Sequence, residues 1–470
     1  MTLDDWLRRR LTPLLAVIFA VWGAYMVYMK FRLLHFGLAT DDLFNYVNAL
    51  YNTNFWDEWL FSARYELLRG APSLLFNHWQ PTLLVLWPLV QVGGAEALLV
   101  VQALAPLWAA VFLLKIAEHL GLKPFERLFV VVVCLFHPNL MAAIMDSLYG
   151  FHGTCLLLYF GAPLAWAAVT GRYVLAFVLL LFFLNVRENA ALYVLGAAAG
   201  WIFFTNPFFT TRRQITIAAT LAVLAFVGGL IVAPRLAGVV HEHAAHAESV
   251  LTHPVRMAHA LSHMDSDWHN LYLWLWPGLA APGTLLMMIP ESVILILAEK
   301  KASHWYGMTL VFIGALAIVQ GLPRVRAFAE GRGWGRALTI LLCLHMAGIA
   351  IAGPKEVRGQ TNKLVSRIGY YVPEASKINA RAAIDTKCRT AVELQAMYGF
   401  GDLPYLQYPR QAMVSKYIIT IPGLASGLAQ IVESRKADLK VIFRDDHLTV
   451  FENPTVPCVL SLEAYREGTG

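Results

Sequence analysis

The sequence predicts a polytopic α-helical membrane protein that ends in a small soluble α/β domain. Of its 470 residues, 58% are hydrophobic and 14% are charged, whereas soluble domains are nearer half apolar and a quarter charged. Apolar runs of about 20 residues recur between Leu11 and Ala352, and a helix of that length crosses a hydrocarbon core of roughly 30 Å. The runs do not alternate with period two, which excludes a transmembrane barrel, and the low charge excludes a disordered chain.

Clusters of basic residues between the apolar runs predict the orientation of the chain. Short cytoplasmic loops of membrane proteins are enriched in Lys and Arg, so these clusters predict a cytoplasmic N-terminus and an extracytoplasmic C-terminus. The arginines therefore report topology, and no nucleic-acid partner is expected. The clusters are Arg8–Arg10, Lys123 with Arg127, Arg212–Arg213, and the run from Arg324 to Arg336.

The apolar runs predict about 11 transmembrane helices within residues 1–353. The least regular stretch, 271–298, is interrupted by Pro277, Pro282 and Pro290 and is expected to be a short helical hairpin. Because both segments that flank it belong outside, this hairpin crosses the membrane twice or not at all. The other spans are expected at 11–30, 95–118, 127–145, 153–170, 172–186, 190–205, 215–233, 305–322 and 337–353.

Two outer segments interrupt this series of spans. In the large first outer loop, 31–81, apolar residues recur every three or four positions from Leu43 to Tyr51, which predicts interfacial amphipathic helices. The second outer segment, 235–270, is rich in histidine. Its His243 and His246 lie one helical turn apart and could ligate a metal, with a solvated helix as the alternative, because no third ligand follows at a distinctive spacing. We assign no metal site and leave a divalent metal open as a cofactor.

The composition changes at Gly353, and residues 354–470 are expected to form the extracytoplasmic α/β domain. Cys388 and Cys458 lie in this tail, in a compartment where disulfides form, and they would pair if their Cα atoms lie within about 7 Å. The pattern predicts strands at Tyr417–Ile421, Leu439–Phe443 and Leu448–Phe451, and a helix at Ser426–Lys436.

Asp41 and Asp42 follow the first span and are the candidates for a catalytic base. A carboxylate at the membrane rim could take the proton of an acceptor hydroxyl or hold a metal. The alternative is a helix cap, because Thr40 and Asp41 precede the periodic run from Leu43 and Asp is a favoured N-cap residue. The residues alone leave both interpretations open.

Polar residues at the outer ends of other spans are candidate substrate-binding groups, because ionisable groups at membrane depth are costly. Arg187 and Glu188 join two apolar runs with almost no loop. Arg187 could bind an anion while Glu188 orients it, or the two could form an ion pair that closes the hairpin. His78 and His152 could orient a phosphate or transfer a proton, or could belong to an interfacial aromatic belt.

A basic and aromatic cluster on the outer side contains Lys300, Lys301, His304 and Tyr306. Lysines on the outer side depart from the positive-inside rule. They could bind a lipid-linked phosphate, and ordinary contact with lipid head groups is the alternative.

The order of these motifs resembles that of domain-of-unknown-function family 2079, a family of polytopic bacterial membrane proteins. The stretch from Asp42 to Tyr51 resembles its D-L-x-x-F-x-Q-A-L-W, and Arg187 to Leu192 resembles its K-E-D-A-A-L. The stretch that starts at His78 resembles the family's H-F-S-P, and Phe151-His152 resembles part of its D-F-H-P. Departures from the family pattern fall on Asn48, Gly150, Gly153 and Asn189, whereas His78, His152 and Glu188 match.

The family in turn resembles the GT-C class of glycosyltransferases, which have many spans and an acidic first outer loop. That resemblance implies an inverting enzyme of the bacterial inner membrane that uses a polyprenyl-phosphate sugar donor at the outer face. The acceptor would be an envelope glycan, lipid or protein. By the same resemblance, Asp41 or Asp42 would be the base, and Arg187 with Lys300 or Lys301 would hold the donor phosphate.

Two other functions stay open on the residues. A transporter or flippase of an anionic lipid or solute could use the same charges as its path, although no internal repeat is visible. A non-catalytic assembly protein could act through its tail domain. We expect Asp42, His78, His152, Arg187 and Glu188 to converge on one outer cavity, because each would cost several kcal/mol if buried apart.

Overall fold

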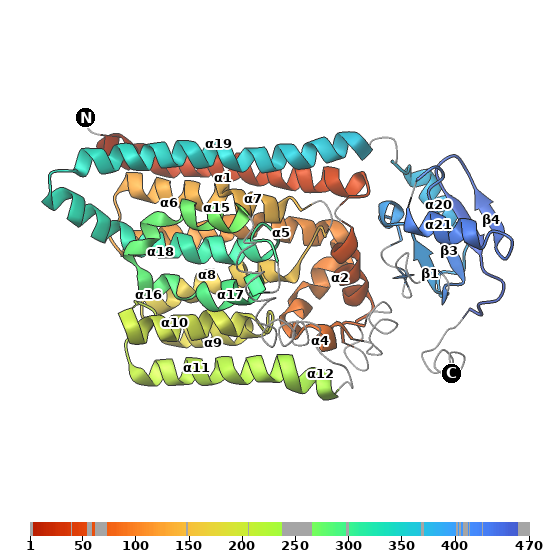
Figure 1. The fold of residues 1–470 in the computed structure, drawn as a ribbon, viewed down its shortest axis with the longest axis horizontal. Coiled ribbons are helices and arrows are strands. Elements are labelled where there is room, and N and C mark those ends of the chain that lie inside the picture. Colours follow the sequence, from red (N-terminus) through yellow and green to blue (C-terminus); the bar gives the residue numbers. More distant parts are fainter. Residues whose placement is uncertain are drawn as a thin grey trace.

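Apolar helices run side by side through most of the chain, and a small sheet domain lies beyond one end of this bundle (Figure 1). The computed structural model describes residues 3–38, 40–53, 59–61, 73–146, 149–204, 206–236, 266–297, 300–367, 371–400, 403, 406–407, 412, 414–424 and 426–458. The histidine-rich residues 237–265, with His243 and His246, lie outside these ranges, so the predictions made for them stay predictions.

The helices of the bundle follow the predicted apolar runs closely. The central helix is α18, which is buried along most of its apolar length, whereas α11 and α19 lie at opposite edges of the view (Figure 1). The helices are α1 (Leu3–His35), α5 (Trp87–His119), α6 (Pro124–Phe136), α7 (Pro138–Ile144), α8 (Leu156–Val169), α9 (Tyr173–Leu184), α10 (Ala190–Phe204), α11 (Arg212–Val227), α12 (Ala233–Leu236), α18 (Tyr306–Gly331) and α19 (Gly335–Arg367). Three short helical turns join them: η1 (Pro81–Leu86), η2 (Gly153–Cys155) and the π-helical η3 (Gly228–Val232).

Among the residues that the structure describes, five helices are long and apolar enough to cross a membrane, so the protein is integral to a membrane. A sixth is counted if α6 and α7, which meet at 44°, form one bent span. Pro138 accounts for the bend because proline cannot donate the hydrogen bond that would continue α6. Three shorter apolar helices lie at Gly153–Val169, Tyr173–Leu184 and Ala190–Phe204. The predicted count of about 11 spans is therefore not confirmed by helix length and composition.

Residues 266–297 fold as a helical hairpin broken at its prolines, into α15 (Ser266–Trp274), η4 (Trp276–Ala280), α16 (Pro282–Leu285) and α17 (Ile289–Leu297). At one end the indole N–H of Trp268 donates to the Lys300 carbonyl at 3.1 Å. At the other end Arg324 donates to the Ala280 carbonyl at 2.7 Å. Along α18, Arg324 lies about 27 Å from the first residue of that helix, at 1.5 Å per residue. The hairpin therefore extends through the depth of the bundle and back.

Two glycines allow the hairpin to pack directly on α10. A Cβ atom at Gly200 would lie 1.8 Å from the carbonyl oxygen of Gly283, and one at Gly196 would lie 2.5 Å from that of Leu286. Small residues spaced four apart let two backbones approach this closely in membrane proteins. The contact fixes the hairpin against the helix that begins directly after Arg187-Glu188-Asn189.

The segment between α1 and η1, predicted as the first outer loop, contains α2 (Asp41–Tyr51) and α4 (Leu74–Asn77). The helix predicted from Leu43 to Tyr51 is present, but it lacks the exposed polar face of an amphipathic helix, because Leu43 to Leu50 are all buried. Its placement at a membrane interface stays a prediction. The Leu43 N–H donates to the Tyr149 carbonyl at 2.9 Å, and the Asn48 side chain donates to the Leu403 carbonyl at 2.6 Å. Since α2 lies between the bundle and the tail, both of its faces are covered.

The tail is a small α/β domain with the strand order β2-β1-β3-β5-β4. The predicted three strands and helix are confirmed as β3 (Tyr417–Thr420), β4 (Lys440–Arg444), β5 (Thr449–Glu452) and α21 (Gly427–Ser434). The sequence pattern did not predict the short β1 (Thr390–Val392) and β2 (Leu406–Gln407) or α20 (Glu374–Ala382). Both pairings of β1 are parallel, and both pairings of β5 are antiparallel.

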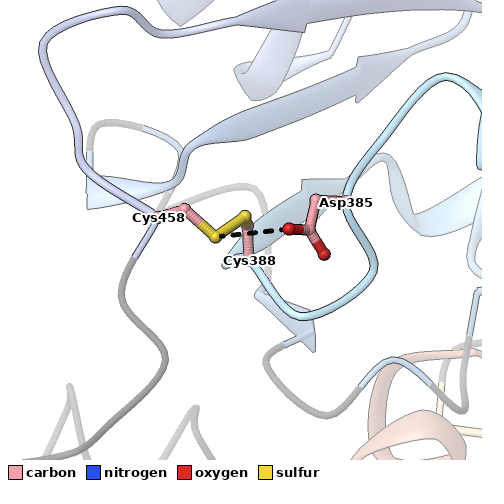
Figure 2. A group of neighbouring side chains, drawn as sticks. All are labelled: Asp385, Cys388 and Cys458. Atoms are coloured by element: carbon pink, nitrogen blue, oxygen red, sulfur yellow. Dashed lines mark hydrogen bonds between the residues drawn. A yellow bond between two sulfur atoms is a disulfide. The ribbon is translucent and has the colours of Figure 1, made fainter.

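Cys388 and Cys458 form a disulfide, as predicted, with their Cα atoms 4.9 Å apart (Figure 2). Asp385 lies beside them, and the three side chains form the only group of potential metal ligands within the described part of the chain. Because the disulfide engages both sulfur atoms, this group offers no metal site in its oxidised form.

The tail is docked on the end of the bundle that holds α2. The Tyr398 hydroxyl donates to Glu96 Oε1 at 2.5 Å, and the Tyr398 ring meets His35 edge to face. Glu96 follows the break in α5 at Gly94, whose φ of 55° is readily adopted only by glycine. The helix α19 continues past Gly353 to Arg367, so the change in composition falls inside a helix.

Candidate functional site

The Arg187 guanidinium is the centre of a buried polar cluster. Arg187 lies in the turn between α9 and α10 and is 2% exposed. Its Nε lies 3.4 Å from Glu188 Oε1, and its Nη1 lies 3.3 Å from His152 Nε2. Its Nη2 lies 3.3 Å from His78 Nε2. Three separate segments of the chain therefore meet at one guanidinium.

Hydrogen bonds between the segments hold His78 in place. His78 Nδ1 lies 2.9 Å from Glu188 Oε1. The next residue, Trp79, donates its indole N–H to the Asn185 side chain at 2.9 Å, and the Thr82 N–H donates to the Asn185 carbonyl at 3.1 Å. Asn185 thus ties the segment that follows α4 to the turn that carries Arg187.

His152 is held by buried partners from another direction. Its backbone N–H donates to Gln102 Oε1 at 2.8 Å, which ties it to α5. Its Nδ1 lies 3.0 Å from Thr154 Oγ1. Nδ1 also accepts from the Thr154 backbone N–H at 3.3 Å. A proton on Nδ1 would serve Thr154 Oγ1 and leave Nε2 to accept from Arg187, but it would give up this backbone contact.

Three aromatic rings enclose these groups. The Trp305 ring stacks on His152 with centroids 4.4 Å apart and an interplanar angle of 8°. Tyr306, at the start of α18, lies with its ring 5.5 Å from the Arg187 guanidinium carbon. Tyr46 of α2 meets the His152 ring edge to face at 5.8 Å.

Glu291 adds a second buried carboxylate near the cluster. It lies in α17 of the hairpin, is 2% exposed, and accepts a hydrogen bond from the Asn189 side chain at 2.7 Å. The charge of Glu291 acts on Arg187 and on Tyr306. Sequence reasoning missed Glu291, although a lone acid inside an apolar run is itself a functional signal. It also missed Tyr46 and Trp305, which carried no comparable signal.

An apolar cavity of about 280 Å³ lies between α8, α9, α10 and α18. Its walls include Leu157, Phe177, Leu180 and Phe312, and its polar lining atoms are few. Thr309, one helical turn after Tyr306, lines it. The cavity therefore begins one turn below the ring that covers Arg187.

The predicted cluster of Lys300, Lys301, His304 and Tyr306 divides between two places. Tyr306 faces Arg187, as described above. Lys301 and His304 line a separate polar cavity. The Lys300 backbone donates to the Leu295 carbonyl and accepts from the Trp268 indole. Trp305 stands between the two places. Lys301 therefore lines a different cavity from the one nearest Arg187, and the predicted role of Lys300 or Lys301 in holding the donor phosphate stays a prediction.

The two aspartates lie at the start of α2. Thr40 occupies the N-cap position, and its side chain makes no capping hydrogen bond. Asp42 is half-buried, and the Asp41 side chain lies outside the part of the chain that the structure describes. Tyr46, one helical turn after Asp42, connects α2 with the cluster through its ring contact with His152. His78, His152, Arg187 and Glu188 meet in one cluster, as predicted, although they line neither the apolar nor the polar cavity. A shared outer cavity that includes Asp42 stays a prediction, and so does the catalytic role of Asp41 or Asp42.

A comparison with protein families identifies the chain at the level of the family. A family model described as "Predicted membrane protein (DUF2079)" matches residues 35–388, about three quarters of the chain. The matched region contains the whole Arg187 cluster. No curated protein matches the chain. The resemblance drawn from the motifs is thereby confirmed, and the likeness to GT-C enzymes stays a prediction.

Proposed function

We propose that this chain, which belongs to the DUF2079 family of predicted membrane proteins, is a membrane-embedded glycosyltransferase whose Arg187 binds the phosphate of a polyprenyl-linked sugar. The observation that supports this proposal is one juxtaposition. A buried guanidinium faces two imidazoles, and the Tyr306 ring beside it lies one helical turn from Thr309, which lines an apolar cavity.

Two partners of Arg187, the imidazoles of His78 and His152, are suited to exchange for an anion, whereas Glu188 remains its ion-pair partner. A neutral imidazole is a weak acceptor for a guanidinium, whereas a phosphate oxygen forms charge-assisted hydrogen bonds that are about twice as strong. An anion that entered between Arg187 and the two rings would therefore take over their contacts. His78 and His152 could then bind a proton and donate to the same anion.

The apolar cavity supports a lipid as the carrier of that phosphate. Its walls come from helices at membrane depth and are almost entirely hydrocarbon. A prenyl chain enters the cavity from an equally apolar bilayer, so the walls accommodate and position the chain without adding hydrophobic free energy. A prenyl chain in the cavity with its phosphate above Tyr306 would use both features at once.

In the proposed reaction, the acceptor hydroxyl attacks the anomeric carbon of the donor sugar. Asp42 or Asp41 takes the hydroxyl proton, the new C–O bond forms, and the bond from the anomeric carbon to the phosphate oxygen breaks. Polyprenyl phosphate leaves with the bonding electrons, and Arg187 stabilises its charge. The acceptor is an envelope glycan, lipid or protein.

The disulfide supports an extracytoplasmic position for the tail, because disulfides persist in oxidising compartments. With the positive-inside rule, it supports an inner-membrane protein of a bacterium with a cytoplasmic N-terminus. The cluster would then face the outer side, where polyprenyl-linked donors and envelope acceptors meet.

A transporter of an anionic solute is the second candidate, and Glu291 is the observation that favours it. Two carboxylates, Glu188 and Glu291, are buried near one arginine. Buried acids at membrane depth are typical of proton-coupled carriers. Such a carrier would need a path to both sides of the membrane.

The test is a transfer assay on membranes that contain the full chain, with a radiolabelled polyprenyl-phosphate sugar and envelope acceptors. Asp42→Asn should lower the transfer rate by about 10²–10⁴-fold, the usual effect of a general base, with donor binding intact. Arg187→Lys keeps the charge and should weaken donor binding first. Wild-type rates in both variants would refute the enzyme, and proton-driven uptake of an anion into vesicles without transfer would establish the carrier.

A further inference from the structure

A second cavity, polar and separate from the apolar one, lies at the outer end of the bundle. Its volume is about 450 Å³, within the range of small-molecule sites. Its walls come from α7 and the residues after it, α15, the loop before α18, and the outer turns of α19. Four elements that are distant in the sequence therefore enclose it.

The charges that line this cavity are balanced. Asp146 and Glu356 supply two carboxylates, and Lys301 and Lys363 supply two ammonium groups. The walls therefore carry no net charge and do not favour a free anion or a free cation. A neutral ligand with many polar groups is the better match.

The remaining polar lining both donates and accepts hydrogen bonds. Asn139, Asn270 and Gln360 offer amides, and Ser303 offers a hydroxyl. Each sugar hydroxyl has one proton to donate and two lone pairs to accept with, so a sugar needs donors and acceptors side by side. Carboxylates, amides and ammonium groups in one cavity provide that mixture.

Aromatic rings connect the cavity with the Arg187 cluster. Tyr149 and His304 line the cavity, with ring centroids 6.0 Å apart. Tyr149 meets the Trp305 ring edge to face at 4.4 Å, and Trp305 in turn stacks on His152. One indole ring therefore separates the polar cavity from a residue that contacts Arg187.

We propose that this cavity binds a neutral saccharide. The role of this saccharide rests on the proposed transferase function. In that reaction, the cavity holds part of the glycan acceptor while a hydroxyl of the acceptor reaches the donor. Trp305 then lies between the bound saccharide and the donor phosphate. The tyrosine and histidine rings present apolar faces to the sugar ring, and the polar lining binds its hydroxyls.

The test measures the binding of maltose and N-acetylglucosamine to the full chain in lipid nanodiscs, by saturation-transfer NMR and calorimetry. At least one of them should bind, and Lys363→Ala and Asn270→Ala should each weaken that binding by about tenfold, the usual effect of losing a hydrogen bond. Lys355→Ala is the matched control on the same helix, because Lys355 is exposed and does not line the cavity. It should leave the affinity unchanged.

Two outcomes would overturn the proposal. One is that neither sugar binds with a Kd of about 1 mM or tighter, equivalent to about 4 kcal/mol. The other is that phosphocholine binds instead and is lost in Lys363→Ala, which would mark a site for zwitterionic lipid head groups. The Arg187→Gln variant distinguishes this proposal from the transferase proposal. If the variant still binds the sugar and transfers at the wild-type rate, the donor site at Arg187 is refuted and the saccharide site is not.

Discussion

Replacement of Gly200 by alanine tests the close contact between α10 and the hairpin. A Cβ at this position would lie 1.8 Å from the Gly283 carbonyl oxygen, so the two backbones must separate by about 1.5 Å to reach ordinary contact. Overpacking of this kind costs about 1–3 kcal/mol. In helix propensity alone, alanine is favoured over glycine by about 1 kcal/mol, so the net loss is at most about 2 kcal/mol.

The matched control for this change is Gly359→Ala in α19. No atom lies within 4 Å of a Cβ at Gly359, so only the gain in helix propensity of about 1 kcal/mol applies. Unfolding in mixed detergent and SDS micelles measures the free energy of unfolding of both variants. We expect Gly200→Ala to be the less stable by about 1–3 kcal/mol, and a Gly200→Ala chain as stable as the control would refute the contact.

Three further predictions concern the tail. Removal of the disulfide, by Cys388→Ser with Cys458→Ser, should cost about 2–4 kcal/mol in the free energy of unfolding, because the bond closes a loop across 70 residues; equal protease resistance with and without the bond would contradict this. Burial raises the pKa of Glu393, so the folded chain binds its proton more tightly than the unfolded chain and loses stability as pH rises from the usual glutamate pKa towards the raised one. Glu393→Gln should therefore raise the melting temperature at pH 7 and have little effect near pH 4, and the same shift at both values would count against that account. A Ser434→Cys chain should react with an impermeant maleimide in intact spheroplasts, because Ser434 is exposed in α21; protection until lysis would place the tail in the cytoplasm.

Hydropathy predicted the helices of the bundle because long apolar runs need no distant partner to be recognised. The strands β3, β4 and β5 were also predicted, since their apolar and β-branched residues are bounded by turn signals. By contrast, β1 and β2 have three and two residues, too few for a periodic pattern. Their pairing is decided by neighbours in the folded domain.

Some residues of the site could be predicted from the sequence and others could not. Arg187 and Glu188 were recognisable because charges between apolar runs are costly, and His78 and His152 because each adjoins a span. The burial of α2 was not predictable, since its cover comes from α5 and from Leu403 in the tail. Nor could the sequence show that Trp305 separates Lys301 from Arg187, because neighbours along a loop can face different cavities.

The account depends most on the claim that Arg187 binds a lipid phosphate. The direct measurement is the affinity of the full chain, in nanodiscs, for a short-chain polyprenyl phosphate. Arg187→Gln should weaken binding by roughly 10–100-fold, because hydrogen bonds to charged groups contribute about 1.5–3 kcal/mol. Arg172→Gln is the control, since the Arg172 guanidinium lies over the Trp166 ring away from the cluster. Equal affinities of wild type, Arg187→Gln and Arg172→Gln would contradict the claim.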